Sequence, residues 1–141
     1  MERKSFEDSL MIATLSNGSR WRRWDLHIHS PASALSNQFP RLANGEPDWD
    51  AYINALENLT EVPAIGITDY FSIEGYKKVL EAKQAGRLKT IKLVLPNIEF
   101  RLDNIIETSK GKRRLNYHVL FSDSVTPQEI EEHFLQEIKF F

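Results

Sequence analysis

Short apolar runs alternate along this chain with longer segments whose apolar residues recur at helical spacing. Alternating strands and helices are typical of an α/β fold with a mainly parallel sheet, whose reactive side chains gather at the carboxyl ends of the strands. Turn-forming residues at 109–112 predict a hairpin between the third and fourth strands. The sequence predicts strands at 24–30, 63–68, 91–95 and 117–121, the first of them buried. Pro96 and Asn97 are expected to interrupt the third strand, which resumes at 98–100. Helices are predicted at 48–59, 72–86 and 126–138.

Each expected helix has a candidate N-cap. Asp48 and Ser72 can cap the first two helices, and Gly86 can end the second. Thr126 and Glu129 form a capping box at the start of the third helix, with proline at its first position.

The composition narrows the chemistry. The chain of 141 residues has no cysteine, so disulfides and thiolate metal sites are excluded and a metal would be held by His, Asp and Glu. A net charge of -2 argues against a general nucleic-acid or membrane binder, and no apolar run approaches the ~20 residues of a membrane span. Residues 1–19 are expected to be a polar lead-in without a signal peptide, and 20–141 a single domain of a cytoplasmic protein.

Two histidines lie at the end of the first expected strand. Residues two apart on a strand share a face, so His27 and His29 point to one side and Ile28 to the other. Two imidazoles that converge near a strand end suit a divalent transition metal. The alternative is that one histidine packs in the core and the other lies on the surface.

Three further ligand-type side chains lie at or near the ends of the later strands. Glu99 is flanked by apolar residues, where an unpaired carboxylate is costly to bury, so it either meets a cation or reaches solvent at a strand tip. His118 alone would be a satisfied core histidine, and Asp69 is a metal ligand, a residue that orients a histidine, or the cap of the following turn. Because these groups share the strand ends with the histidine pair, the sequence predicts a metal centre. His133, off the apolar stripe of the last helix, is expected at the surface.

The ordered motifs resemble those of PHP (polymerase and histidinol phosphatase) domains. Residues 25–33 (DLHIHSPAS) are similar to the first motif, and 66–69 (GITD) with 72–76 (SIEGY) to the second. Residues 97–100 (NIEF) resemble the segment with the metal-bridging glutamate, and 116–120 (NYHVL) resemble the third histidine motif. The set as a whole is much more specific than the histidine pair.

The resemblance implies the N-terminal part of a distorted (β/α)7 barrel of PHP type, with a β-hairpin insertion. Such a domain binds two or three divalent ions (Mn, Zn or Fe) and hydrolyses phosphate esters through a metal-activated water. By this resemblance His27, His29 and Glu99 hold one ion, Glu99 and His118 share a second, and Asp69 and Glu99 are the catalytic residues. The expected substrate is a phosphate ester such as a nucleic acid or a nucleotide.

Residues 20–24 further resemble the start of PHP domains at the head of TrlF-like ATPases of AAA or SMC type, which are linked to defence against phage. An ATPase portion, covalently linked or associated, is therefore an expected partner, although no phosphate-binding Gly-x-x-x-x-Gly-Lys-Ser/Thr loop occurs in this chain. No membrane partner is expected.

Two features depart from the family pattern. Tyr70 occupies the position of a family histidine, and a phenol is a poor ligand at neutral pH, which leaves the third ion without that ligand. The closing Asp-x-His motif of the family is also missing. A barrel of this type needs ~200 residues or more, so the chain is expected to cover only the first part of the domain.

Two basic clusters are candidates for substrate binding. Arginines next to aromatic residues can bind phosphates and stack on bases, whereas the alternative is that the tryptophans pack at the strand entry and the hairpin tip is a solvated turn. For the tryptophans we favour packing. The clusters are Arg20, Arg22 and Arg23 with Trp21 and Trp24, and Lys110, Lys112, Arg113 and Arg114.

Three functions compete at this point. The first is a metal-dependent phosphoesterase of PHP type. The second is a non-catalytic, regulatory PHP module with a degenerate metal site, which Tyr70 favours. The third is an amidohydrolase-like hydrolase, against which the spacing of Asp69 and Glu99 speaks.

Overall fold

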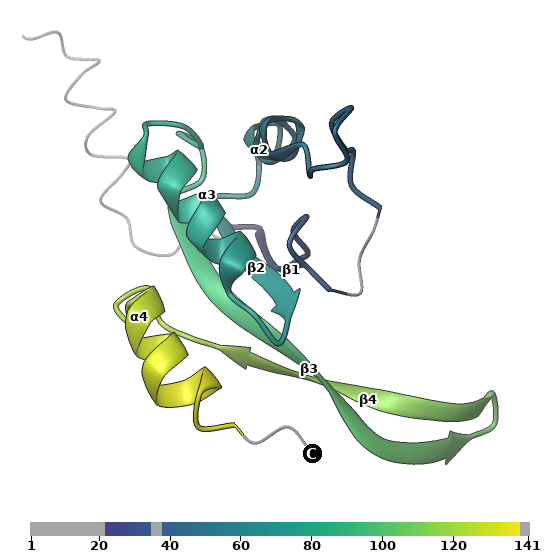
Figure 1. The fold of residues 1–141 in the computed structure, drawn as a ribbon. Helices are drawn as coiled ribbons and strands as arrows, with labels where there is room; N and C mark the ends of the chain where they lie inside the picture. Colours follow the sequence, from purple (N-terminus) through teal and green to yellow (C-terminus); the bar gives the residue numbers. More distant parts are fainter. Residues whose placement is uncertain (1–21, 35–37, 139–141) are drawn as a thin grey trace, which may run out of the picture.

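The computed structural model describes residues 22–34 and 38–138, so the expected lead-in at 1–19, Arg20 and Trp21 lie outside the described residues. In the described ranges the strands form a four-stranded sheet with the order β1-β2-β3-β4 (Figure 1). The elements are β1 (Trp24–Ile28), α2 (Trp49–Glu57), β2 (Ala64–Tyr70), α3 (Glu74–Gln84), β3 (Leu93–Thr108), β4 (Gly111–Leu120), α4 (Pro127–Ile130) and a π-helical turn η1 (Glu131–Leu135).

The first three strands are parallel, and β4 is antiparallel to β3. The mixed α/β architecture is therefore confirmed. The predicted hairpin turn at 109–112 is confirmed, but the hairpin is not inserted between two separate strands, because β3 and β4 are themselves its two arms (Figure 1). Thr108 pairs with Gly111 across a two-residue turn, and Gly111 has a φ of +99°, a conformation that suits glycine. So short a connection can join only antiparallel neighbours.

Pro96 does not interrupt the third strand, contrary to the prediction, since β3 runs through it from Leu93 to Thr108. A proline lacks the N–H group that a central strand donates. The carbonyl of Pro96 accepts a hydrogen bond from the backbone N–H of Phe121, just past the end of β4. The proline nitrogen faces this same side, where the antiparallel pairing with β4 ends, so no ladder bond is lost within the pairing.

β1 is not buried as predicted, because it is the edge strand of the described sheet and only β2 pairs with it. Its residues are exposed or half-buried, and Trp24 is 56% exposed, so the expected packing of this tryptophan at the strand entry is wrong. β2, which is central, is buried along its whole length.

The two faces of the sheet have different roles. Ile65 and Ile67 of β2 pair with Val94 and Pro96 of β3, and their face packs against the helices. On this face α3 contacts β2 and β3, and Phe134 of η1 lies against Phe100 of β3. The opposite face carries Tyr70, Glu99 and His118.

The predicted helix starts are largely confirmed. The Asp48 side chain accepts a hydrogen bond from the backbone N–H of Ala51, and the Thr126–Glu129 capping box is formed. The cap of α3 is Ile73 rather than Ser72, but the Ser72 hydroxyl still accepts a hydrogen bond from the N–H of Glu74. No helix in the described part of the chain has the length and apolar content to cross a bilayer.

Candidate metal centre

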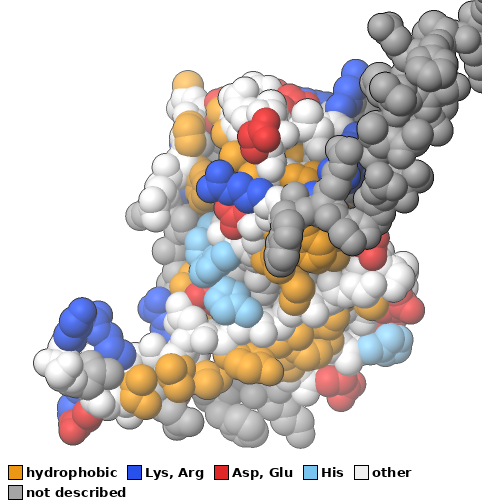
Figure 2. All heavy atoms as spheres, turned by 180° about the vertical axis from the view of Figure 1, so that it is seen from behind, with side chains coloured by type: hydrophobic (Ala, Val, Ile, Leu, Met, Phe, Trp, Pro, Cys, Tyr) orange, Lys and Arg blue, Asp and Glu red, His pale blue; other side chains and the backbone are white. Residues whose placement is uncertain are grey.

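Strand alternation places one polar side chain from each of β2, β3 and β4 next to the pair formed by His27 and His29. Tyr70 of β2 pairs in register with Glu99 of β3, and Glu99 pairs with His118 of β4. Ile28 faces the core, so His27 and His29 point to the same face as Glu99. Figure 2 views the molecule from the side opposite to Figure 1 and shows histidine side chains reaching the surface there.

Three donor atoms form a nearly equilateral triangle. The Nε2 atoms of His27 and His29 lie 3.3 Å apart, and each lies 3.4 Å from Oε2 of Glu99. In a tetrahedral site with ligand bonds of ~2.0–2.1 Å the donors are ~3.3–3.4 Å apart. All three sides of the triangle therefore match the edge of a tetrahedral metal site, and the prediction that His27 and His29 converge is confirmed.

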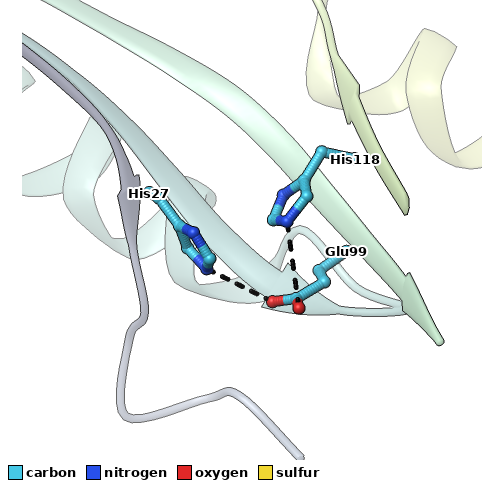
Figure 3. Close-up of side chains that lie close together, drawn as sticks. All are labelled: His27, Glu99 and His118. Atoms are coloured by element: carbon cyan, nitrogen blue, oxygen red, sulfur yellow. Dashed lines mark ion pairs between the residues drawn. The ribbon is translucent and has the colours of Figure 1, made fainter. Parts of the chain in front are cut away.

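His118 approaches the other oxygen of the same carboxylate. Its Nε2 atom lies 3.8 Å from Oε1 of Glu99, and the imidazoles of His27 and His118 both point toward the Glu99 carboxylate (Figure 3). Ligand atoms of His27, Glu99 and His118 all lie within 4.8 Å of one another. This cluster could hold one metal ion, with Glu99 able to offer an oxygen to each side.

Glu99 is the unusual member of the cluster because its side chain is only 1% exposed. Oε1 accepts a hydrogen bond from the Asn116 side-chain amide, whereas Oε2 has no hydrogen-bond partner among the described residues. A buried carboxylate oxygen without a partner is costly. A cation bound between Oε2 and the two imidazoles would remove this cost, so the residues present fit a divalent metal.

The imidazoles are suited to act as ligands. Burial lowers the pKa of His118, although the Glu99 carboxylate opposes the shift, and this favours the neutral form that binds metals. His27 is 54% exposed, so the cluster is open to water and to a substrate. His29 is held more firmly, because its ring stacks on Tyr70 at 5.4 Å and its Nδ1 atom lies 3.4 Å from the Ser33 hydroxyl.

The structure does not bring Asp69 to this cluster. Asp69 pairs with the core residue Ile98, so strand alternation sends its side chain to the helical face. There Oδ1 accepts a hydrogen bond from the Ser30 N–H (3.0 Å), and Oδ2 accepts from the Ser30 hydroxyl (2.8 Å) and the Gly75 N–H (3.1 Å). Burial raises the pKa of Asp69, against the effect of these hydrogen bonds. Among the three roles left open by the sequence, the hydrogen bond from Gly75 favours the cap of the following turn, and the contacts with Ser30 also position the segment after His29.

Gly75 is required for this arrangement. A Cβ atom at this position would lie 2.0 Å from the Ser30 hydroxyl oxygen and 2.2 Å from Oδ2 of Asp69. The first turn of α3 can therefore approach Asp69 only without a side chain. Gly66 has a similar role between the strands, since a Cβ atom there would lie 2.5 Å from the carbonyl oxygen of Leu26.

Tyr70, unlike Asp69, faces the cluster. Burial and the nearby Glu99 carboxylate raise the pKa of Tyr70, so its hydroxyl stays protonated at neutral pH and is a poor metal ligand. The Asn116 amide lies 3.4 Å from this hydroxyl and also donates to Glu99. Tyr70 therefore supports His29 and is linked to Glu99 through Asn116.

The predicted substrate-binding arginines are divided between distant places. Arg22 and Arg23 line a shallow pocket with Thr60, Glu61 and Pro63. This pocket lies before β1 and β2, at the end of the parallel strands opposite to the histidine cluster, so these two arginines are not brought to it.

The basic residues of the hairpin are exposed on the arm that projects from the body of the molecule (Figure 1). Arg114 pairs with Asp103 at 3.1 Å, and Lys112 lies 3.8 Å from Glu107, while Arg113 is opposite Ile106. These residues lie farther along β3 and β4 than the histidine cluster does, so the structure does not bring them to it. His133 is exposed, as predicted.

Sequence reasoning missed Asn116 and Arg101. Both lie two residues from a predicted ligand on the same strand, Asn116 before His118 and Arg101 after Glu99. The two-residue period of a strand is the signal that would have found them. Ser30 was missed because its contact with Asp69 joins segments far apart in the sequence.

No family model matches this sequence, and neither a curated protein nor a solved structure matches it. The function must therefore be inferred from the geometry of the cluster and from the sequence motifs.

Proposed function

We propose that the chain is a metal-dependent phosphoesterase whose centre is formed by His27, His29, Glu99 and His118. One observation carries the proposal: the buried, unpartnered Oε2 of Glu99 lies 3.4 Å from two imidazole nitrogens, at the donor spacing of a tetrahedral site. Burying a carboxylate without a partner costs free energy, and a divalent cation bound to it would offset that cost.

The residues of the chain prepare the site before any ligand binds. A divalent ion held there would lower the pKa of a bound water and stabilise negative charge on a phosphate ester. Asn116 fixes the Glu99 carboxylate, and Tyr70 and Ser33 fix the His29 ring. The exposed side of His27 leaves space for a substrate on the face away from the helices.

The order of the sequence motifs supports phosphate esters, including nucleic acids or nucleotides, as the substrate class. The three parallel strands with helices on one face are compatible with the first part of a distorted (β/α)7 barrel of PHP type. The closer resemblance to TrlF-like proteins adds the proposal of an ATPase partner and of a role in defence against phage. By the same resemblance, Glu99 and His118 would hold a second ion.

A non-catalytic metal-binding module is the second candidate function. The observation that favours it is Tyr70, which faces the cluster at a position where the resembling family has a ligand. The two candidates differ in hydrolysis and agree in metal binding.

The test is a measurement of bound metal and of hydrolysis on the same samples. Metal-free protein would be titrated with Zn²⁺ and Mn²⁺ by calorimetry, together with a His27→Ala/His29→Ala variant. His133→Ala is the matched control, because this histidine is exposed on η1. We expect the wild type and the control to bind metal and the double variant to lose binding. Equal binding by all three would overturn the proposal.

Hydrolysis of p-nitrophenyl phosphate and of bis-p-nitrophenyl phosphate by the metal-loaded protein then separates the two candidates. Because part of the family ligand set is missing, we expect slow turnover that the double variant abolishes. Metal binding without any hydrolysis of either ester would favour the non-catalytic module.

A further inference from the structure

Arg101 lies beside the metal cluster on the same face of the sheet. It follows Glu99 by two residues on β3 and pairs in register with Asn116 of β4, the residue whose amide donates to Glu99. Residues two apart on a strand are ~7 Å apart, which is within the reach of an arginine side chain. The guanidinium is thus tied to the neighbourhood of the cluster by its position in the sheet.

The Arg101 guanidinium also makes a defined contact with the ring of Tyr70. Its central carbon lies 5.5 Å from the centre of the Tyr70 ring, in the range of a cation–π contact. The same ring stacks on His29, and its hydroxyl lies 3.4 Å from the Asn116 amide. The Tyr70 ring therefore connects Arg101 to His29, one of the histidines of the cluster.

The charge of Arg101 is available to a ligand. Two other arginines of the described residues form ion pairs, Arg114 with Asp103 and Arg87 with Glu57 and Asp50. Arg101 forms no ion pair with any described carboxylate, and its side chain is exposed. An unpaired guanidinium beside a cluster with the chemistry of a metal site provides a second positive contact for an anion.

We propose that Arg101, seated on Tyr70, binds the non-bridging oxygens of the substrate phosphoryl group next to the metal centre. The inference rests on the proposed phosphoesterase function and names the residue that recognises the substrate. The planar fork of a guanidinium can donate two parallel hydrogen bonds to two oxygens of one phosphoryl group. Arg22 and Arg23 lie at the other end of the parallel strands, and Arg114 is paired with Asp103, so we assign to Arg101 the substrate contact that the sequence predicted for these residues.

The test uses phenylphosphonate, a phosphate-ester analogue that is not hydrolysed. Its affinity for the metal-loaded protein would be measured by calorimetry for the wild type and for Arg101→Ala, Arg101→Gln and Arg101→Lys. Lys78→Ala is the control, since Lys78 is an exposed cation of α3 on the other side of the sheet. The metal affinity of every variant is measured first.

We expect phenylphosphonate to bind about tenfold or more weakly to the alanine and glutamine variants, as for the loss of a charged hydrogen bond. The lysine variant should retain part of the affinity, because it keeps the charge but not the fork. Metal affinity should stay within about twofold in all variants, because Arg101 touches no ligand atom in the proposed site.

The outcomes separate this inference from the function on which it rests. A wild type that binds metal, but binds phenylphosphonate no better than Arg101→Ala does, overturns the inference and leaves the metal site standing. A loss of metal affinity in the Arg101 variants also overturns it, because the residue would then support the cluster itself. A wild type that binds no metal overturns the proposed function and the inference together.

Discussion

The Glu99→Gln substitution tests whether the Glu99 carboxylate serves metal binding or the stability of the fold. In the metal-free protein, Oε2 of Glu99 is buried without a hydrogen-bond partner among the described residues, 3.4 Å from two imidazole nitrogens. An amide nitrogen in place of this oxygen can donate to either imidazole, while the remaining oxygen still accepts from Asn116. The substitution therefore removes an unsatisfied buried group and a buried charge at once.

The expected change in the free energy of unfolding follows from the loss of this unsatisfied group. An unsatisfied buried polar group costs about 1–3 kcal/mol, so the metal-free variant should be as stable as the wild type or more stable by up to that amount. For a chain of this length 1 kcal/mol corresponds to about 3–4 °C in melting temperature. A metal at 100 times its dissociation constant adds about 2.7 kcal/mol to the wild type, or about 9 °C, and should add nothing to the variant.

The assay is thermal unfolding with a chelator and then with Zn²⁺ or Mn²⁺. Glu107→Gln is the control, because this carboxylate is 81% exposed on the same strand and should change stability by less than about 0.5 kcal/mol. If the metal-free Glu99→Gln variant were less stable by more than about 1 kcal/mol, the carboxylate would be a structural group. If it kept the metal-induced shift, Glu99 would not be a ligand.

Three further predictions follow from the same contacts. Gly75→Ala should lower the free energy of unfolding by about 3 kcal/mol, because its Cβ would lie 2.0 Å from the Ser30 hydroxyl oxygen; a change of the urea midpoint equivalent to less than about 1 kcal/mol would contradict this. Asp69→Asn should reduce metal affinity only about tenfold, as for a residue that positions a ligand; complete loss of binding in calorimetry would instead make Asp69 a ligand. Metal affinity should fall as the pH is lowered from 7 to 5, because protons compete for the imidazoles. Since burial lowers the pKa of His118 below its ordinary value of 6.5, this imidazole is protonated at a lower pH than a free imidazole, and a pH-independent affinity would argue against imidazole ligands.

Local features of the fold could be predicted because they depend on neighbouring residues. The Asp48 cap, the Thr126–Glu129 capping box and the turn before Gly111 each follow from a few adjacent side chains. The prediction for Pro96 failed, because the loss of a backbone donor matters only if a partner strand lies on that side. The partner strand β4 ends beside Pro96, so the missing N–H group removes no hydrogen bond from the pairing of β3 with β4.

The candidate site was predictable in its members and less so in its geometry. The convergence of His27 and His29 follows from their spacing, and the ends of parallel strands bring Glu99 close to them. Asp69 also lies near a strand end, but the face that it occupies depends on the register between β2 and β3. Arg22 and Arg23 precede their strand, so they lie at its other end.

The sequence by itself determined the residue types that can bind a metal, the strand and helix periods and most of the helix caps, because these depend on composition and on contacts within a few residues. Only the tertiary structure decided that β4 runs antiparallel and sets His118 beside Glu99, that Asp69 turns to the helices, and that Arg101 rests on Tyr70. These contacts join residues from different strands, and the register and direction of strand pairing are fixed by the packing of the whole sheet.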